Sequence, residues 1–318
     1  MITGILAGLT WALETVFMGI ALGMSPFLST PQAIMIAPFA ATFLHDGFSA
    51  LVLLLYNAIR GDLKEFPRIF KNPECKWLVL ASAIGGPVGM TGYVMAVNYM
   101  GASIGAVASA VYPAIGTLLA FLFLKEKVRW YQWIFLAFTL IGVYGLSYSP
   151  DMAVSNFWLG LLGAFMCAFG WGTEAVILAK CLKDPSIKDS CALNLRQGVS
   201  ALIYGSVILP LLGGWEFIPT LFTGSSMSVM SVIGASALFA SVSYLFYYKA
   251  IAKLGAAKAM ALNITYTAWA ILLSAIVLRD TTALNPLSIV CTVVVVVCGV
   301  LAACDLSKLF GRQKRMLP

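Results

Sequence analysis

Residues 157–179 read FWLGLLGAFMCAFGWGTEAVILA, an apolar stretch in which Glu174 is the one charged residue. The hydrocarbon core of a bilayer is about 30 Å thick, so a helix that crosses it needs roughly 20 mostly apolar residues. This stretch is long and apolar enough, and we expect it to span a membrane. Similar stretches recur along the chain, and the sequence predicts ten spans, at 3–23, 33–59, 77–99, 103–124, 131–148, 157–179, 191–213, 228–250, 257–278 and 286–304.

The composition of the whole chain agrees with a membrane protein. Hydrophobic residues make up 61% of the 318 residues, charged residues make up 10%, and the mean hydropathy is +0.93. Soluble domains carry about 25% charged residues. Every loop between the expected spans is short, which leaves no room for a soluble domain. The sequence therefore predicts an all-α membrane protein, a single unit of ten transmembrane helices in the lipid bilayer.

The basic residues are distributed unequally between alternate loops. With the N-terminus in the cytoplasm, eighteen of the twenty Lys and Arg residues lie in cytoplasmic loops or in the C-terminal tail, and the two others are Arg196 and Arg279. Membrane proteins retain Lys and Arg on the cytoplasmic side. Both termini are therefore predicted to be cytoplasmic. The same rule accounts for the net charge of +7 without a nucleic-acid partner.

The two halves of the chain resemble each other when one is shifted against the other. The aligned residues are Trp11 and Trp171, Glu14 and Glu174, His45 and Arg196, Asp46 and Gln197, Tyr93 and Tyr247, Tyr112 and Tyr266, and Lys125 and Arg279. HDGFSAL at 45–51 and RQGVSAL at 196–202 share four identical residues. We expect a first five-helix repeat over 1–149, a second over 156–304, and a basic cytoplasmic tail over 305–318.

The second repeat is predicted to be inverted relative to the first. Five helices is an odd number, so the second repeat enters the membrane from the opposite side. The loop charges agree, because the basic loop at 60–76 aligns with 213–220, which contains no Lys or Arg. Inverted repeats are typical of transporters that expose a central site to either side of the membrane in turn. The sequence thus predicts transport of a small solute by alternating access.

Five ionisable residues lie inside the predicted spans. A charge at the centre of a bilayer costs at least about 2.5 to 3.5 kcal/mol on insertion scales, so such residues are functional candidates. The residues are Glu14, His45, Asp46, Glu174 and Arg196. For His45, Asp46 and Arg196 two roles stay open: they take part in coupling, or they form a structural pair, Asp46 with Arg196 or with His45, that joins the halves.

Aromatic residues accompany the two glutamates at helical spacing. Residues three apart share one face of a helix, so the two W-x-x-E motifs place Trp11 beside Glu14 and Trp171 beside Glu174. Aromatic faces attract a poorly hydrated quaternary ammonium by about 2 kcal/mol or more when desolvated. The alternative is that these rings are ordinary residues of apolar helices. Further candidates for this cation site are Tyr112, Tyr244, Tyr247, Tyr248, Asn263, Tyr266 and Trp269.

Four segments resemble a known family. These are GGPVGMTGYVMAVNYMGASIGAVASAVYPAIGTLLAFLFLKEK at 85–127, AFMCAFGWGTEAVI at 164–177, HDGFSAL at 45–51, and YLFYYKAIAKLGAAKAMALNITYTAWAIL at 244–272. The ten-helix pattern resembles the drug/metabolite transporter superfamily, with its paired EamA-type domains. Within that superfamily, the four segments are most similar to bacterial Lic-type choline transporters.

This resemblance implies a multi-pass protein of a bacterial inner membrane that takes up choline or a related quaternary amine. By motif, the residues implied near the substrate are Tyr112, Trp171, Glu174, Tyr248, Asn263, Tyr266 and Trp269. Glu14 departs from the family pattern, which implies a small or apolar residue there. A second carboxylate at this position suits a more polar or doubly charged amine, or a proton-coupling role, and both alternatives stay open.

The rival within transporters is an exporter of amino acids or other small metabolites, with Arg196 as the basic residue for an anionic or zwitterionic substrate. An enzyme is not expected, because the sequence has no D-x-x-D cluster and no H-E-x-x-H motif, and its one histidine stands alone. No cofactor or metal is expected either. The transport direction, the coupling ion and the oligomeric state, with a homodimer as one alternative, are left open by the sequence.

Overall fold

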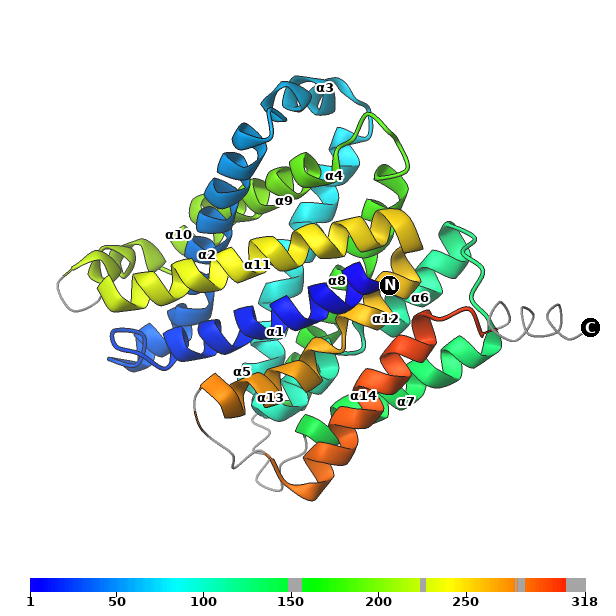
Figure 1. Ribbon diagram of the computed structural model, residues 1–318. Helices are drawn as coiled ribbons and strands as arrows, with labels where there is room; N and C mark the ends of the chain where they lie inside the picture. The colour runs from blue at the N-terminus through cyan, green and yellow to red at the C-terminus, as the bar shows by residue number, and fades with distance from the viewer. Residues whose placement is uncertain (148–155, 224–226, 278, 280–283, 307–318) are drawn as a thin grey trace, which may run out of the picture.

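The computed structural model describes residues 1–147, 156–223, 227–277, 279 and 284–306, and all regular structure in these ranges is helical (Figure 1). The longer helices are α1 (Ile2–Leu22), α2 (Pro31–Ile59), α5 (Gly89–Ser109), α7 (Trp130–Ser147), α8 (Phe157–Cys181), α9 (Asp189–Ile203), α11 (Met227–Leu254) and α14 (Pro286–Ala303). The shorter ones are η1 (Leu63–Glu65), α3 (Phe66–Lys71), α4 (Cys75–Ala83), η2 (Ile84–Val88), α6 (Tyr112–Phe123), η3 (Tyr204–Ile208), α10 (Leu209–Leu211), η4 (Gly214–Glu216), η5 (Ile218–Phe222), α12 (Ala256–Asn263) and α13 (Tyr266–Val277).

Several helix starts follow directly from capping residues in the sequence. The side chain of Thr30 accepts a hydrogen bond from Ala33 N at the start of α2, and that of Asn156 accepts one from Leu159 N at the start of α8. Asn285 and Ser288 form a reciprocal capping box at the start of α14. Such caps satisfy backbone N–H groups that have no partner within the helix.

Within the described residues, seven stretches of helix are long and apolar enough to cross a membrane, or eight if the bent pair Asp189–Leu211 and Gly214–Phe222 forms one span. The prediction of an all-helical membrane protein is confirmed. The predicted number of spans, ten, is larger than the seven or eight that meet this test. The difference between ten and eight lies in α6 and α7, which are apolar but shorter. At a rise of 1.5 Å per residue, the 12 residues of α6 extend only about 18 Å.

Two of the predicted spans are interrupted. The prediction of one helix over 103–124 is wrong, because α5 continues to Ser109 and α6 begins anew at Tyr112. Pro113 at the start of α6 has no N–H group to continue the hydrogen-bond ladder of a preceding helix. The span at 257–278 is likewise divided, with α12 ending at Asn263 and α13 beginning at Tyr266.

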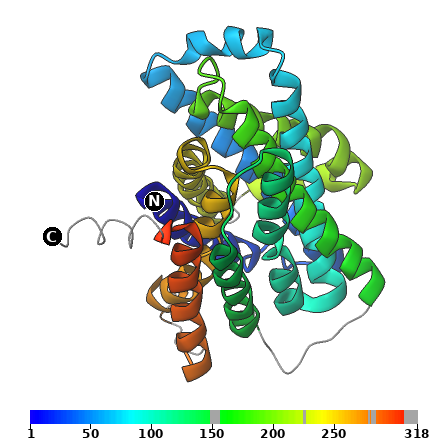
Figure 2. The same cartoon turned by 90° about the vertical axis from the view of Figure 1, so that its right-hand side faces the viewer.

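Long helices from the two halves of the chain pack side by side. Helix α1 lies along α11 (Figure 1), α5 lies along α8, and α7 lies along α14 (Figure 2). Glycine permits the close contact between α5 and α8, because a Cβ added at Gly92 would lie 2.6 Å from both Cys167 N and Gly163 O. Small residues at such contacts let membrane helices approach closely.

An ion pair joins the loop after α2 to the loop before α9. Lys188 Nζ donates a hydrogen bond to Asp62 Oδ1, and Arg60 Nε lies 3.6 Å from Asp62 Oδ2. The hydrogen bond from Lys188 and the nearby positive charges lower the pKa of the Asp62 carboxyl group from its usual range. The pair therefore connects the first half of the chain to the second at this end of the helices.

We expect Asp62→Asn to lower the melting temperature of the detergent-solubilised protein at pH 7. A carboxyl group with a depressed pKa contributes stability above its unfolded pKa of about 3.9, and loses it as the pH falls through its folded pKa. The melting temperatures of the wild type and the variant should therefore converge as the solution is acidified below pH 4 or so. A difference that persists unchanged in acid would contradict this account.

Candidate functional site

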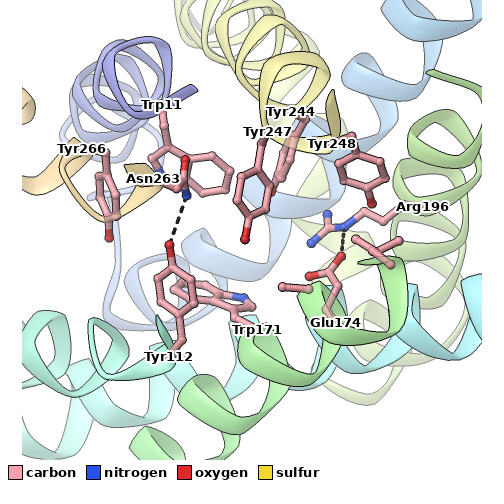
Figure 3. Close-up of a pocket in the computed structure, with 12 residues that line it drawn as sticks. Trp11, Tyr112, Trp171, Glu174, Arg196, Tyr244, Tyr247, Tyr248, Asn263 and Tyr266 are labelled. Atoms are coloured by element: carbon pink, nitrogen blue, oxygen red, sulfur yellow. Dashed lines mark hydrogen bonds and ion pairs between the residues drawn. The ribbon is translucent and has the colours of Figure 1, made fainter. Parts of the chain in front are cut away.

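Aromatic side chains from five helices surround a small cavity of about 40 Å³ (Figure 3). We refer to this space as the small cavity. Its lining residues are Trp11, Tyr112, Trp171, Glu174, Ala175, Leu178, Arg196, Tyr244, Tyr247, Tyr248, Asn263 and Tyr266. Segments far apart in the sequence thus contribute to one site, which contains two tryptophans, five tyrosines and a single carboxylate.

The rings of the small cavity support one another. Trp11 packs edge-on against Tyr244 with ring centroids 4.7 Å apart, and Trp171 packs edge-on against Tyr112 at 5.7 Å. Asn263 Nδ2 donates a hydrogen bond of 3.1 Å to the Tyr112 hydroxyl group (Figure 3). Aromatic pairs in edge-to-face geometry stabilise each other beyond their buried area, so the cavity has fixed walls.

Glu174 is paired with Arg196 in the small cavity (Figure 3). Arg196 Nε donates a hydrogen bond of 2.8 Å to Glu174 Oε1, and Arg196 Nη1 donates one of 2.6 Å to Gln197 Oε1. The guanidinium carbon also lies 5.2 Å from the centre of the Tyr244 ring. The sequence left the partner of Arg196 open. Its shorter contact is with Glu174, and Asp46 Oδ2 lies 3.7 Å from Arg196 Nη1.

A larger cavity of about 280 Å³ adjoins the small one. We refer to it as the large cavity. The residues that line both cavities are Trp11, Trp171, Arg196, Tyr244 and Tyr266. The large cavity adds Glu14, His45, Asp46 and Tyr93 to them.

The polar residues of the two cavities form a continuous series of contacts. His45 Nε2 lies 3.5 Å from Glu14 Oε1, and His45 Nδ1 lies 2.9 Å from Asp46 Oδ1. Asp46 leads to Arg196, and Arg196 leads to Glu174. The series therefore contains three carboxylates against one guanidinium and one imidazole.

The balance of charge in this series depends on how many of the carboxylates are ionised. With all three ionised, their negative charge exceeds the positive charge of Arg196 and a protonated His45 together. A charge buried in an apolar region is costly unless an opposite charge balances it. A bound monovalent cation brings this balance closer, whereas a bound anion worsens it. The electrostatics of the two cavities therefore favour a cation.

The structure brings most of the residues predicted to bind substrate into one place. Seven of them line the small cavity: Trp11, Tyr112, Trp171, Glu174, Tyr248, Asn263 and Tyr266. Glu14 lines the large cavity together with His45 and Asp46, and Arg196 lines both. Trp269 lines neither, and its indole Nε1 is buried with no hydrogen-bond partner.

Two features of the site were not among the predicted site residues. Tyr93 lines the large cavity and stacks on Trp171 with ring centroids 6.1 Å apart. Its alignment with Tyr247 is the sequence signal that points to it. Gly85 in η2 is the second feature, because a Cβ at this position would overlap the carboxyl group of Glu174. Only a glycine leaves space for Glu174 to reach Arg196.

Gly85→Ala is expected to lower the melting temperature of the purified protein, because the methyl group displaces the Glu174 carboxylate from Arg196. Thermal melting in detergent measures this. Gly47→Ala is the matched control, since a Cβ at Gly47 meets nothing within 4 Å. Equal melting temperatures of the two variants would rule out a role for Gly85 in holding Glu174.

Three comparisons relate the chain to known proteins. Residues 1–148 match the sequence profile of the EamA-like transporter family. The chain is 28% identical to Protein LicB of Haemophilus influenzae over 268 residues, which cover 84% of this chain and 85% of that protein. A solved crystal structure of another protein has the same fold, with a TM-score of 0.68 and 18% identity over 96% of this chain and 98% of that chain. The first half of the chain is therefore similar to the EamA-like transporter family, and most of the chain is similar to Protein LicB.

Proposed function

We propose that the protein is a secondary transporter that takes up a small quaternary ammonium ion, most specifically choline, across a bacterial inner membrane. The observation that carries this proposal is the small cavity, in which seven aromatic rings accompany Glu174 and Arg196 beside a series of residues that contains three carboxylates. Ring faces attract a quaternary ammonium without hydrogen bonds. The resemblance to Lic-type choline transporters supports the same substrate.

The architecture that suits this function is two inverted five-helix repeats, 1–149 and 156–304, with both termini cytoplasmic and a basic tail over 305–318, of which 307–318 lie outside the described residues. In this proposal α6 and α7 also cross the membrane, which raises the number of spans to ten. Matched helix contacts support the repeats. In the repeat alignment α1 corresponds to α8, α5 to α11, and α6 to α13. The contact of α1 with α11 therefore matches the contact of α8 with α5, and the contact of α13 with α1 matches that of α6 with α8.

Local backbone geometry supports the repeats as well. Helices α6 and α13 begin at the aligned tyrosines, Tyr112 and Tyr266. Lys125 and Arg279, aligned at the same offset, are the two non-glycine residues with positive φ in the described chain, at 54° and 55°. Such a backbone is uncommon for side-chain-bearing residues, so its recurrence at aligned positions favours a duplicated fold. Inverted repeats permit alternating access by rocking one half against the other.

Uptake of a monovalent cation requires no second ion. A cation that enters down the membrane potential gains about 2.3 kcal/mol for each 100 mV, which is enough for roughly fifty-fold accumulation. We expect purified protein in vesicles with an inside-negative potential to take up radiolabelled choline with saturable kinetics, and Glu174→Gln to reduce this uptake strongly. Absence of saturable uptake, or normal transport by Glu174→Gln, would overturn the proposal.

The rival is export of amino acids or other small metabolites, and one observation favours it: the Arg196 guanidinium lines both cavities. Against it, Arg196 already contacts Glu174, Gln197 and Asp46. Displacement of bound choline separates the two functions. Tetramethylammonium and ethanolamine should compete better than betaine or amino acids if the protein carries cations, and the opposite order supports the exporter.

A further inference from the structure

We propose that the large cavity contains a second cation-binding subsite, in which Glu14 is the counter-charge for the ammonium group. This subsite is the counterpart of the small cavity under exchange of the two halves of the chain. The inference rests on the proposed function, because it takes the substrate to be a small organic cation. It adds a second position for that cation and assigns its charge balance to Glu14 rather than to Glu174.

The aligned residues of the two halves line different cavities. Glu174 lines the small cavity, and its counterpart Glu14 lines the large one. Tyr247 lines the small cavity, and its counterpart Tyr93 lines the large one. Trp11 lines both cavities, as does its counterpart Trp171. Exchange of the halves therefore converts Glu174 and Tyr247 of the small cavity into Glu14 and Tyr93 of the large one.

The contacts within the two linings correspond as well. Trp171 and Tyr112 have ring centroids 5.7 Å apart, and their counterparts Trp11 and Tyr266 have centroids 6.0 Å apart. Tyr112 lines the small cavity only, whereas the other three rings line both cavities. The ring pair of the small cavity thus has a counterpart that also lines the large one.

The ionisable residues repeat the same arrangement. Arg196 contacts Glu174 at 2.8 Å, and its counterpart His45 lies 3.5 Å from Glu14. Arg196 also contacts the next residue, Gln197, at 2.6 Å, and His45 contacts its own next residue, Asp46, at 2.9 Å. Each cavity thus has a carboxylate facing a nitrogen-bearing side chain that is held by its neighbour in the chain.

The two carboxylates differ in how fully they are already balanced. Glu174 receives a short hydrogen bond from a permanent cation, Arg196. Glu14 faces an imidazole at a distance too long for a good hydrogen bond, and its other partners are the hydroxyl groups of Thr15 at 3.3 Å and Ser236 at 3.4 Å. In the described part of the chain no Lys or Arg forms an ion pair with Glu14.

Burial does not explain this difference, because the side chains of Glu14 and Glu174 are 12% and 11% exposed. The space beside them does differ, since the large cavity has about 280 Å³ and the small one about 40 Å³. Glu14 therefore has no permanently charged cation as a partner in the described part of the chain, and it has room beside it for a ligand. The chemistry that fits is a small organic ammonium ion whose methyl groups lie against Trp11, Tyr93 and Tyr266.

Equilibrium binding of tetramethylammonium to the purified full-length protein tests this subsite. We expect Glu14→Gln to weaken binding by about tenfold or more. The matched control is Glu216→Gln, which removes an exposed carboxylate that lines neither cavity and should leave the affinity unchanged. Tyr93→Leu should also weaken binding, and Tyr93→Phe, which retains the ring, should restore it.

The outcomes separate this inference from the proposed function. If the wild-type protein binds no tetramethylammonium, the proposed function itself fails. If the wild type binds it and Glu14→Gln binds as tightly as Glu216→Gln, the subsite is overturned while cation transport stands. Thermal melting of Glu14→Gln checks its folding, and if that variant is unfolded, the comparison of Tyr93→Leu with Tyr93→Phe decides the question.

Discussion

Replacement of Arg196 with methionine is expected to abolish choline uptake and to lower the free energy of unfolding by about 3 to 5 kcal/mol. The guanidinium group is buried and contacts Glu174 at 2.8 Å and Asp46 at 3.7 Å. Its removal leaves two carboxylates with no permanent cation beside them, and breaking a buried ion pair by removing one partner is strongly destabilising. Uptake into vesicles and denaturant titration in detergent measure the two effects.

Arg196→Lys separates charge from geometry in this pair. Lysine keeps the positive charge but lacks the planar fork with which arginine contacts Glu174 and Gln197 together. We therefore expect Arg196→Lys to recover much of the stability and only part of the uptake. Wild-type stability and uptake in Arg196→Met would contradict the role assigned to the ion pair.

Trp171→Leu is expected to have the second large effect, a loss of about 2 kcal/mol in choline binding, or about thirtyfold in affinity. Trp171 lines both cavities and contacts Tyr93 on one side and Tyr112 on the other. Leucine fills part of the space but has no ring face for the cation. Isothermal titration of the purified variant with choline measures the change.

Two variants control for the loss of a large side chain. Trp171→Phe keeps a ring at the site and should retain more affinity than Trp171→Leu. Trp130→Leu removes a tryptophan that is 75% exposed and lies outside both cavities, so it should bind choline as the wild type does. Equal losses in Trp171→Leu and Trp171→Phe would indicate that shape, rather than the ring face, determines binding.

The apolar runs predicted the helical membrane fold because length and hydropathy are local properties of the sequence. Helix breaks are less local. The division before Tyr112 was not predicted, since an apolar run such as 103–124 reads the same with or without an interruption. Proline is tolerated inside α2 at Pro38 but coincides with a break at Pro113, and surrounding helices decide between these outcomes.

The outcome for Trp269 has another cause. Asn263, Tyr266 and Trp269 recur at three-residue steps, but Trp269 lies almost one full turn beyond Tyr266 along α13, about 4.5 Å further along the helix axis. Asn263 and Tyr266 line the small cavity, whereas Trp269 lines neither cavity.

The ionisable residues were recognisable from sequence because charges are rare in apolar spans. Their partners were not, because a partner is chosen by distance in the folded protein. Sequence considerations paired Asp46 with Arg196 or His45, and both contacts are present. The shorter contact of Arg196 is made with Glu174 on α8, and no sequence pattern relates these two residues.

The proposed function requires the site to recognise the positive charge of its ligand and not merely its shape. The most direct test compares the affinity of choline with that of its neutral carbon isostere, in which a quaternary carbon replaces the quaternary nitrogen. The two compounds have nearly the same size and the same hydroxyl group. We predict that choline binds at least about thirtyfold more tightly, and equal affinities for the two compounds would contradict the account.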